Sequence, residues 1–150
     1  MNKISKVFIS IGIILITSSI LLIIYNNYEE KKAGLNSKEA LSLIKDNLEE
    51  NNIDNQIKFV KANNREMKTI QINNYDYIGT INIPVLNLEL PVMSECDYTR
   101  LDIAPCRYYG SIYTNDLIIC AHSYNNLFGR LKELNIGDIV ILTDMNNNEY

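Results

Sequence analysis

One imidazole and three thiols are the side chains of this chain best suited to proton transfer or nucleophilic attack. His122 is the only histidine among 150 residues, and Cys96, Cys106 and Cys120 are the only cysteines. An imidazole exchanges protons near neutral pH, and a thiolate attacks carbonyl carbon. Cys120 and His122 are two positions apart, so they would share one face of a strand. Apolar neighbours raise the pKa of a thiol, however, so we expect Cys120 to be a small buried hydrophobe rather than the nucleophile.

Two other uses of the cysteines remain open. Cys96 and Cys106 would close a short loop if they formed a disulfide outside the cell, although the odd number of cysteines leaves the pairing undecided. A zinc site built from Cys106, Cys120 and His122 would lack a fourth ligand and a recognisable spacing. We therefore expect no metal and no other cofactor.

The elements around His122 can be predicted from hydropathy. The segment 117–121 is apolar at every position, which predicts a central strand covered on both faces, with His122 at its end. An unpaired imidazole buried there would be costly, so a partner is expected. Helical spacing then places four apolar side chains on one face of a short helix: Leu127, Phe128, Leu131 and Leu134. Gly137-Asp138 turns the chain into another apolar run, 139–142, and Asn146-Asn-Asn148 predicts a further turn.

Residues 75–150 are predicted to form a mostly β domain. Alternation with period two gives one strand over 77–83, which Pro84 ends because proline lacks an amide hydrogen, and a second strand over 86–92. Together with the apolar runs 117–121 and 139–142, these strands are consistent with part of a small barrel that carries one short helix.

The N-terminus predicts a membrane anchor. No charged side chain occurs in residues 7–25, and 19 helical residues span about 28 Å, close to the thickness of a bilayer core. A cleaved signal peptide is the rival interpretation, but no small-x-small site follows Ile24. Lysines flank the run on both sides, at Lys3 and Lys6 before it and at Lys31, Lys32 and Lys38 after it. The short head, residues 1–6, favours a cytoplasmic N-terminus and an extracellular domain.

Residues 26–74 are predicted to be a stalk. Asn36 and Glu39 suit a capping box, and Ala40, Leu41, Ile44 and Leu48 follow at helical spacing, which predicts an amphipathic helix over about 37–50. This helix would be a spacer that lies against the domain or a neighbour. Short strands are predicted at 57–60 and 67–72.

Three blocks of the sequence resemble the sortases, the cysteine transpeptidases of Gram-positive cell surfaces. They are Tyr77-Ile-Gly-Thr-Ile-Asn-Ile-Pro84, Leu88-Glu-Leu-Pro-Val92 and the segment 116–134 around His122. The resemblance implies an incomplete sortase-like β-barrel behind the transmembrane helix and the helical stalk, with His122 as the general acid and base. The glycine that usually precedes the family's histidine is Ala121 here.

The resemblance also implies a reaction and its partners. A sortase cysteine attacks a sorting signal similar to Leu-Pro-x-Thr-Gly in a secreted protein, forms a thioester, and passes the protein to an amine of a peptidoglycan precursor or a pilin. An arginine steadies the oxyanion or positions the substrate. In the family both residues come well after the histidine, so neither the cysteines above nor Arg107 and Arg130 match them. We read both arginines as surface residues.

We therefore expect these 150 residues to be the N-terminal part of a single-pass, extracellular-facing sortase, as a fragment, a truncated gene or half of a split pair, and to be inactive alone. The alternative is a non-catalytic remnant or a membrane-tethered binding module. The net charge of −4 and the absence of a dense basic stretch argue against nucleic-acid binding. Near His122, Tyr124, Asn125 and Asn126 are expected to shape a groove or to cap the next helix. Asp97, Asp102 and Asp116 are expected to be turn or solvated residues.

Overall fold

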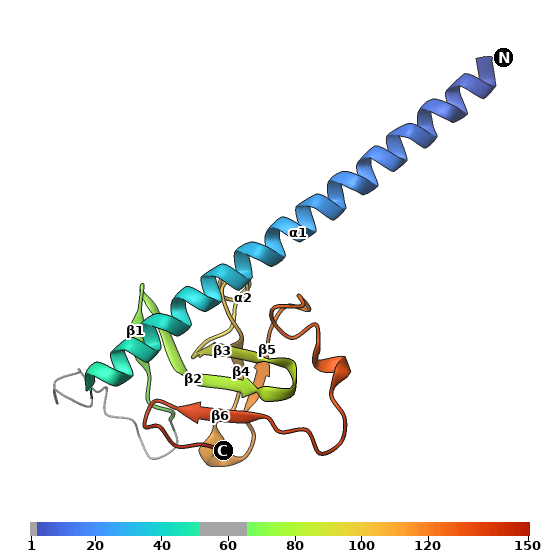
Figure 1. The fold of residues 1–150 in the computed structure, drawn as a ribbon. Coiled ribbons are helices and arrows are strands. Elements are labelled where there is room, and N and C mark those ends of the chain that lie inside the picture. The colour runs from blue at the N-terminus through green and yellow to red at the C-terminus, as the bar shows by residue number, and fades with distance from the viewer. Residues whose placement is uncertain (1–2, 52–65) are drawn as a thin grey trace.

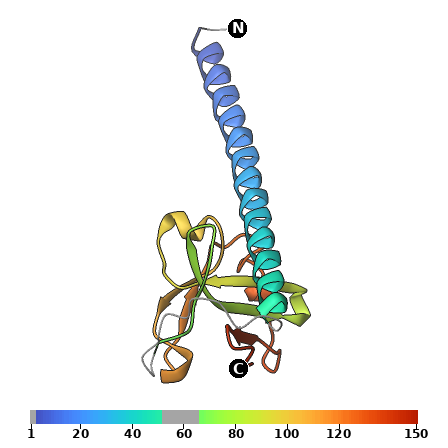
Figure 2. The same cartoon turned by 90° about the vertical axis from the view of Figure 1, so that its left-hand side faces the viewer.

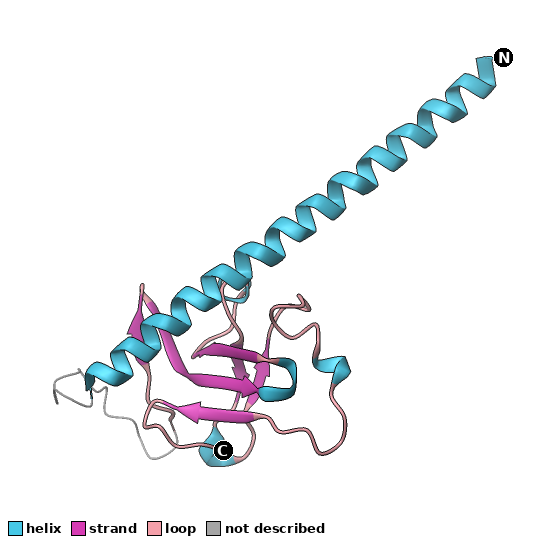
Figure 3. Cartoon of the chain, viewed as in Figure 1, coloured by secondary structure: helices cyan, strands magenta, loops and turns pink. Residues whose placement is uncertain are grey.

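A long helix and a six-stranded mixed sheet make up the part of the chain that the structure describes, residues 3–51 and 66–150 (Figures 1 and 3). The structure is a computed structural model. In chain order the elements are α1 (Lys3–Asn51), β1 (Ile70–Ile72), β2 (Tyr75–Ile83), the 3-10 helix η1 (Pro84–Leu86), β3 (Leu88–Met93), α2 (Tyr98–Leu101), β4 (Cys106–Tyr109), η2 (Ile112–Thr114), β5 (Ile118–Cys120), η3 (Leu131–Glu133) and β6 (Ile141–Asp144).

The first half of α1 extends away from the sheet (Figures 1 and 2). Its apolar side chains are exposed on every side of the helix, for example Phe8 at 69% and Leu21 at 66%. A helix that is apolar all round and touches no protein needs an apolar surrounding. By length and composition α1 can cross a membrane, as a single span or a signal anchor.

The second half of α1 packs on the sheet. Its buried positions, Ala33, Gly34, Ser37, Ala40 and Ile44, follow one another at steps of one, three or four residues, so they form one helix face against β1 and β3. A salt bridge of 2.7 Å joins Lys45 to Glu89 on β3. The predicted amphipathic spacing and the packing of this spacer against the domain are thus confirmed.

The predicted start of that helix is wrong. Asn36 lies inside α1, where the preceding turn already satisfies the backbone donors that a cap would bind. The apolar span and the stalk helix form one continuous helix. The segment between Tyr25 and Ser37 contains no proline and a single glycine, Gly34, and one glycine is not enough to end a helix. Of the predicted short strands, 67–72 corresponds to β1, and 57–60 lies outside the described residues.

The sheet order is β1-β2-β3-β4-β5. β1 pairs with the first residues of β2, Tyr75–Tyr77, and β6 pairs with the later residues Gly79–Asn82. The pairs are antiparallel except β3 with β4. The first two predicted strands are confirmed as β2 and β3, with Ile81 opposite Leu90, and β2 ends just before Pro84. The predicted start of the second strand is wrong, because Leu86 belongs to η1 and β3 begins at Leu88. An irregular register between Tyr77 and Gly79 turns Ile78 inward as well, so it is fully buried.

The prediction of a central strand before His122 is wrong. β5 is short and lies at the end of the sheet order, with Ile118 51% exposed. Its apolar run therefore has one well-packed neighbour, β4. The next predicted strand is shifted: β6 begins at Ile141, and Ile139 is exposed. The turn predicted at Asn146–Asn148 is confirmed, since Asn147 adopts φ 61° there.

The short helix predicted over 127–134 is replaced by turns and η3. The amides of Leu127 and Gly129 both bind the carbonyl of Tyr124, and the amide of Phe128 binds the carbonyl of His122. These bonds bring the chain back on itself and prevent a regular helical ladder. The apolar stripe still packs: Leu127 is fully buried and its three partners are half-buried against the core.

Candidate functional site

His122 follows β5 directly and presents a partly exposed imidazole. Its Nε2 lies 3.1 Å from Oδ1 of Asp102, and its side chain is 31% exposed. The ring of Tyr124 lies 5.0 Å away, tilted by 37°. In the tautomer that carries its proton on Nε2, His122 donates to the carboxylate and keeps Nδ1 as an acceptor. The arrangement is a carboxylate-oriented imidazole that solvent can reach.

Asp102 is positioned by α2. Asp97 is the N-cap of this four-residue helix and accepts from the amide of Arg100 at 2.8 Å, and Asp102 is its C-cap. The bond from the Arg100 amide, followed by the Arg100 side chain, lowers the pKa of Asp97. The short helix α2, capped at its N-terminus by Asp97, therefore positions the Asp102 carboxylate that contacts His122.

Asp102 is the site residue that sequence reasoning missed. It lies in a turn and its side chain is 56% exposed, as expected, but it also contacts His122, and no spacing rule connects it to a histidine 20 positions later. The contact depends on β3 pairing with β4 at Met93 and Cys106, and on β4 pairing with β5 at Cys106 and Cys120. The apolar strand before His122 gave one signal, since it predicted a polar partner for the imidazole without naming it.

The other two aspartates stabilise turns, as predicted. Asp97 caps α2, and Asp116 accepts from the amide of Ser111 at 3.0 Å. Hydrogen bonds from the Thr114 hydroxyl and the Ser111 amide lower the pKa of Asp116.

The loop after His122 is attached to α1. The amide of Asn125 donates to Oε1 of Glu30 at 3.1 Å, and the side-chain amide of Asn126 donates to the Glu30 carbonyl. Gly34 lies so close to Asn126 that a Cβ at position 34 would overlap that amide. The two asparagines therefore join the histidine loop to the helix instead of capping a following helix.

The cysteines form a cluster beside the histidine, not with it. The Cys120 sulfur lies 2.9 Å from the Cys96 sulfur and 3.6 Å from the carbonyl of Cys106. Burial, the hydrogen bond to Cys96 and the charge of that thiol raise the pKa of Cys120 to about 11. Burial and the neighbouring thiols of Cys96 and Cys120 raise the pKa of Cys106 far above its ordinary value. The prediction that this apolar setting raises a thiol pKa is confirmed, whereas the prediction that Cys120 is buried is wrong: it is partly exposed because β5 ends the sheet order.

All three cysteines are free thiols in the structure, so the Cys96–Cys106 disulfide considered above is not formed; the Cys96 and Cys120 thiols are hydrogen-bonded at 2.9 Å. Within residues 3–51 and 66–150, no three His, Cys, Asp or Glu side chains converge as metal ligands.

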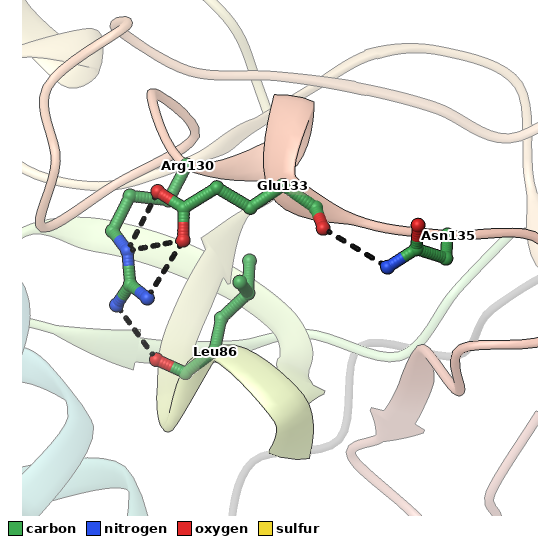
Figure 4. Close-up of polar contacts among 4 residues, drawn as sticks. All are labelled: Leu86, Arg130, Glu133 and Asn135. Atoms are coloured by element: carbon green, nitrogen blue, oxygen red, sulfur yellow. Dashed lines mark hydrogen bonds and ion pairs between the residues drawn. The ribbon is translucent and has the colours of Figure 1, made fainter.

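Arg130 is engaged within the loop region (Figure 4). Its guanidinium binds both carboxylate oxygens of Glu133, with the shortest contact at 2.9 Å, and donates to the Leu86 carbonyl at 3.0 Å. The ion pair raises the pKa of Arg130 and lowers that of Glu133. Arg107 donates to the Ser94 carbonyl at 2.8 Å. Both arginines thus stabilise loops, and neither contact involves His122.

Searches with this sequence found no matching family model and no matching curated protein.

Proposed function

We propose that this chain is the histidine-bearing part of a membrane-anchored, sortase-like cysteine transpeptidase. In this proposal the domain faces the cell wall, and the nucleophilic cysteine and the oxyanion-binding arginine come from sequence outside these 150 residues. The substrates are secreted proteins with a sorting signal of the Leu-Pro-x-Thr-Gly type, and the acceptor is an amine of a peptidoglycan precursor or a pilin.

The observation that carries the proposal is the environment of His122. The imidazole stands at the end of a strand, is oriented by Asp102 and remains 31% exposed. A general acid and base needs this combination, because it must keep a fixed orientation and still reach a reacting group.

The geometry of the thiols supports a nucleophile from elsewhere. The Cys120 sulfur faces Cys96 and the Cys106 carbonyl, while His122 faces Asp102 and Tyr124. With a pKa of about 11, Cys120 is almost entirely protonated at neutral pH. Activation of a thiol by His122 therefore requires another cysteine opposite the exposed side of the ring.

The helix supplies the anchor that the proposal requires. The apolar run of α1 ends near Tyr25, and Glu30 already binds the histidine loop. Five helical residues span about 7.5 Å, so the site would lie near the membrane surface, within reach of the secreted substrates of this proposal.

The test starts with the coding DNA that follows the codon for Tyr150. A continuing frame that encodes a Thr-Leu-x-Thr-Cys block and a later arginine is expected. The protein made from it should cleave a fluorogenic sorting-signal peptide, and His122→Gln should lower kcat/KM by about 10²–10⁴-fold. Arg130→Gln is the matched control and should keep kcat/KM within a few-fold, because Arg130 binds Glu133 and Leu86 and not the imidazole.

The competing possibility is a non-catalytic, membrane-tethered remnant or binding module. It would be favoured by a stop codon after Tyr150 together with a stably folded 150-residue chain that cleaves no peptide. Cleavage that persists in His122→Gln would reject the proposed role of the imidazole.

A further inference from the structure

The three cysteine sulfurs gather at one place although they are spread over 25 residues. Cys96 lies in the loop before α2, Cys106 begins β4 and Cys120 ends β5. Cys106 and Cys120 are opposite each other in the sheet, but their sulfurs do not pair: the Cys106 thiol donates to the Ala104 carbonyl at 3.3 Å. The close pair is Cys96 with Cys120, whose sulfurs lie 2.9 Å apart.

Exposure separates this pair from the third thiol. Cys106 is completely buried, whereas Cys96 and Cys120 are both partly exposed. Cys96 also lines an open pocket of about 450 Å³, together with Arg107 and Gly110. A small reagent can therefore reach Cys96 while Cys106 stays shielded.

We propose that Cys96 and Cys120 are a redox site that closes to an intramolecular disulfide. A disulfide bond is about 2.05 Å long, so small rotations of the two side chains bring the sulfurs to bonding distance. The predicted extracellular side of a membrane is a compartment where such bonds persist. This inference goes beyond the proposed transpeptidase activity and holds whether or not that activity is found.

The oxidant is a disulfide of a small thiol, such as oxidised glutathione. The thiolate of Cys96 attacks one sulfur of the reagent, whose disulfide bond breaks and releases one small thiol. The thiolate of Cys120 then attacks the Cys96 sulfur of this mixed disulfide and releases the second small thiol. Two protons and two electrons pass from the protein to the reagent, which leaves as two thiols.

The bond would connect the two segments that carry the histidine pair. Cys96 directly precedes Asp97, the N-cap of α2, and Asp102 is the C-cap of the same helix. Cys120 lies two residues before His122, which binds Asp102. A covalent link between Cys96 and Cys120 therefore joins the start of the segment that carries Asp102 to the end of β5, next to His122. It restricts the motion of the Asp102 carboxylate relative to the imidazole.

The test uses the full chain in lipid nanodiscs, first reduced and then equilibrated with glutathione at graded ratios of disulfide to thiol. After acid quenching and unfolding, free thiols are alkylated and counted by intact mass. Trypsin cuts after Arg100 and Arg107, so the three cysteines fall on three different peptides. We expect one alkylated thiol, Cys106, and a cross-linked pair of peptides that contains Cys96 and Cys120.

Three variants control the assignment. Cys106→Ala should form the same cross-link with no thiol left, and Cys96→Ser should retain two alkylated thiols. Cys120→Ser should form no cross-link, and its Cys96 should be found either alkylated or as a mixed disulfide with glutathione, because no second thiol resolves that adduct. Three free thiols in the wild-type chain at every ratio, or a cross-linked peptide that contains Cys106, would overturn the proposal. If Cys106→Ala does not fold, the wild-type peptide map decides alone.

The effect on the histidine has its own readout. His122 is the only histidine, so its ring gives one set of NMR signals. Oxidation should change the position and width of these signals in the wild-type chain and leave them unchanged in Cys96→Ser treated with the same reagent. Identical signals in the oxidised and reduced wild-type chain would show that the bond does not restrict the histidine pair.

Discussion

The imidazole of His122 and the thiol of Cys120 lie on one short segment but belong to different environments. His122 reaches solvent and a carboxylate, whereas Cys120 faces two other cysteines. Two residues on one strand face need not act together, because the strand ends at Cys120 and the chain turns away at His122. Proximity in sequence therefore gives no thiol–imidazole pair here.

The raised pKa of Cys120 leads to a prediction about its reactivity. Because burial and the Cys96 thiol favour the protonated form, Cys120 in the reduced chain should react slowly with iodoacetamide at pH 7.5 and about tenfold faster for each pH unit up to pH 9.5. Mass spectrometry of the peptide that begins after Arg107 measures this rate. A plateau reached by pH 9 would show that the thiol has an ordinary pKa.

At the scale of elements, the periodicity of apolar residues predicted those strands and helix faces whose side chains pack on a core. The strands β2 and β3 were predicted because their alternating side chains face one core, and the buried face of α1 was visible in the spacing of Ala40 and Ile44. Neither the turns after Tyr124 nor the end position of β5 was predictable, since both depend on long-range contacts. The same holds for Asp102, whose contact with His122 crosses three strands.

The contact between α1 and the histidine loop can be tested at a glycine. Gly34→Ala should gain up to about 1 kcal/mol of helix propensity but push Asn126 away, since a Cβ there overlaps its amide. Hydrogen exchange at the Asn125 amide, which binds Glu30, should become faster. Gly12→Ala is the control: a Cβ at Gly12 meets nothing within 4 Å, so exchange at Asn125 should stay unchanged. Equal exchange in both variants would show that the helix does not hold the loop.

The turn after β6 depends on Asp144. Its carboxylate is 2% exposed and accepts hydrogen bonds from the amides of Asn146 and Asn148 and from the hydroxyls of Tyr113 and Tyr150. Burial works against the charged form, but these bonds outweigh it and lower the pKa of Asp144. Asp144→Asn should therefore reduce the free energy of unfolding by about 1–3 kcal/mol.

The same carboxylate gives a pH dependence. A lowered pKa stabilises the folded chain above the unfolded value of about 3.9 and loses this effect as the pH falls through the folded value. Urea denaturation followed by tyrosine fluorescence should thus show a large difference between wild type and Asp144→Asn at pH 7 and a small one in acid. Asp76→Asn, at an exposed position on β2, is the control and should change little at either pH. A difference that grows in acid would contradict this role.

At the scale of the whole molecule, one uninterrupted helix connects the apolar N-terminal run to the site. α1 runs from Lys3 to Asn51 without a break. Its second half packs on β1 and β3, and Glu30 binds the loop after His122. In the proposed membrane anchor, the helix itself and not a flexible stalk therefore sets the height of His122 above the bilayer.

Paramagnetic lipids test this placement. In nanodiscs that carry gadolinium on a fraction of the headgroups, the NMR signals of the His122 ring should broaden strongly, because Glu30 lies only about 7.5 Å along the helix from Tyr25. In Gly34→Ala, with the loop released from α1, the broadening should decrease. A wild-type ring signal that the headgroups leave sharp would place the site away from the membrane.

The most direct measurement for the proposed function is the intact mass of the protein after incubation with a sorting-signal peptide of the Leu-Pro-x-Thr-Gly type. We predict no adduct on the 150-residue chain, and in the longer protein a thioester on a cysteine that follows Tyr150, formed at least 100-fold more slowly in His122→Gln. An acyl adduct on Cys96, Cys106 or Cys120, or a rate of thioester formation that does not change in His122→Gln, would contradict it.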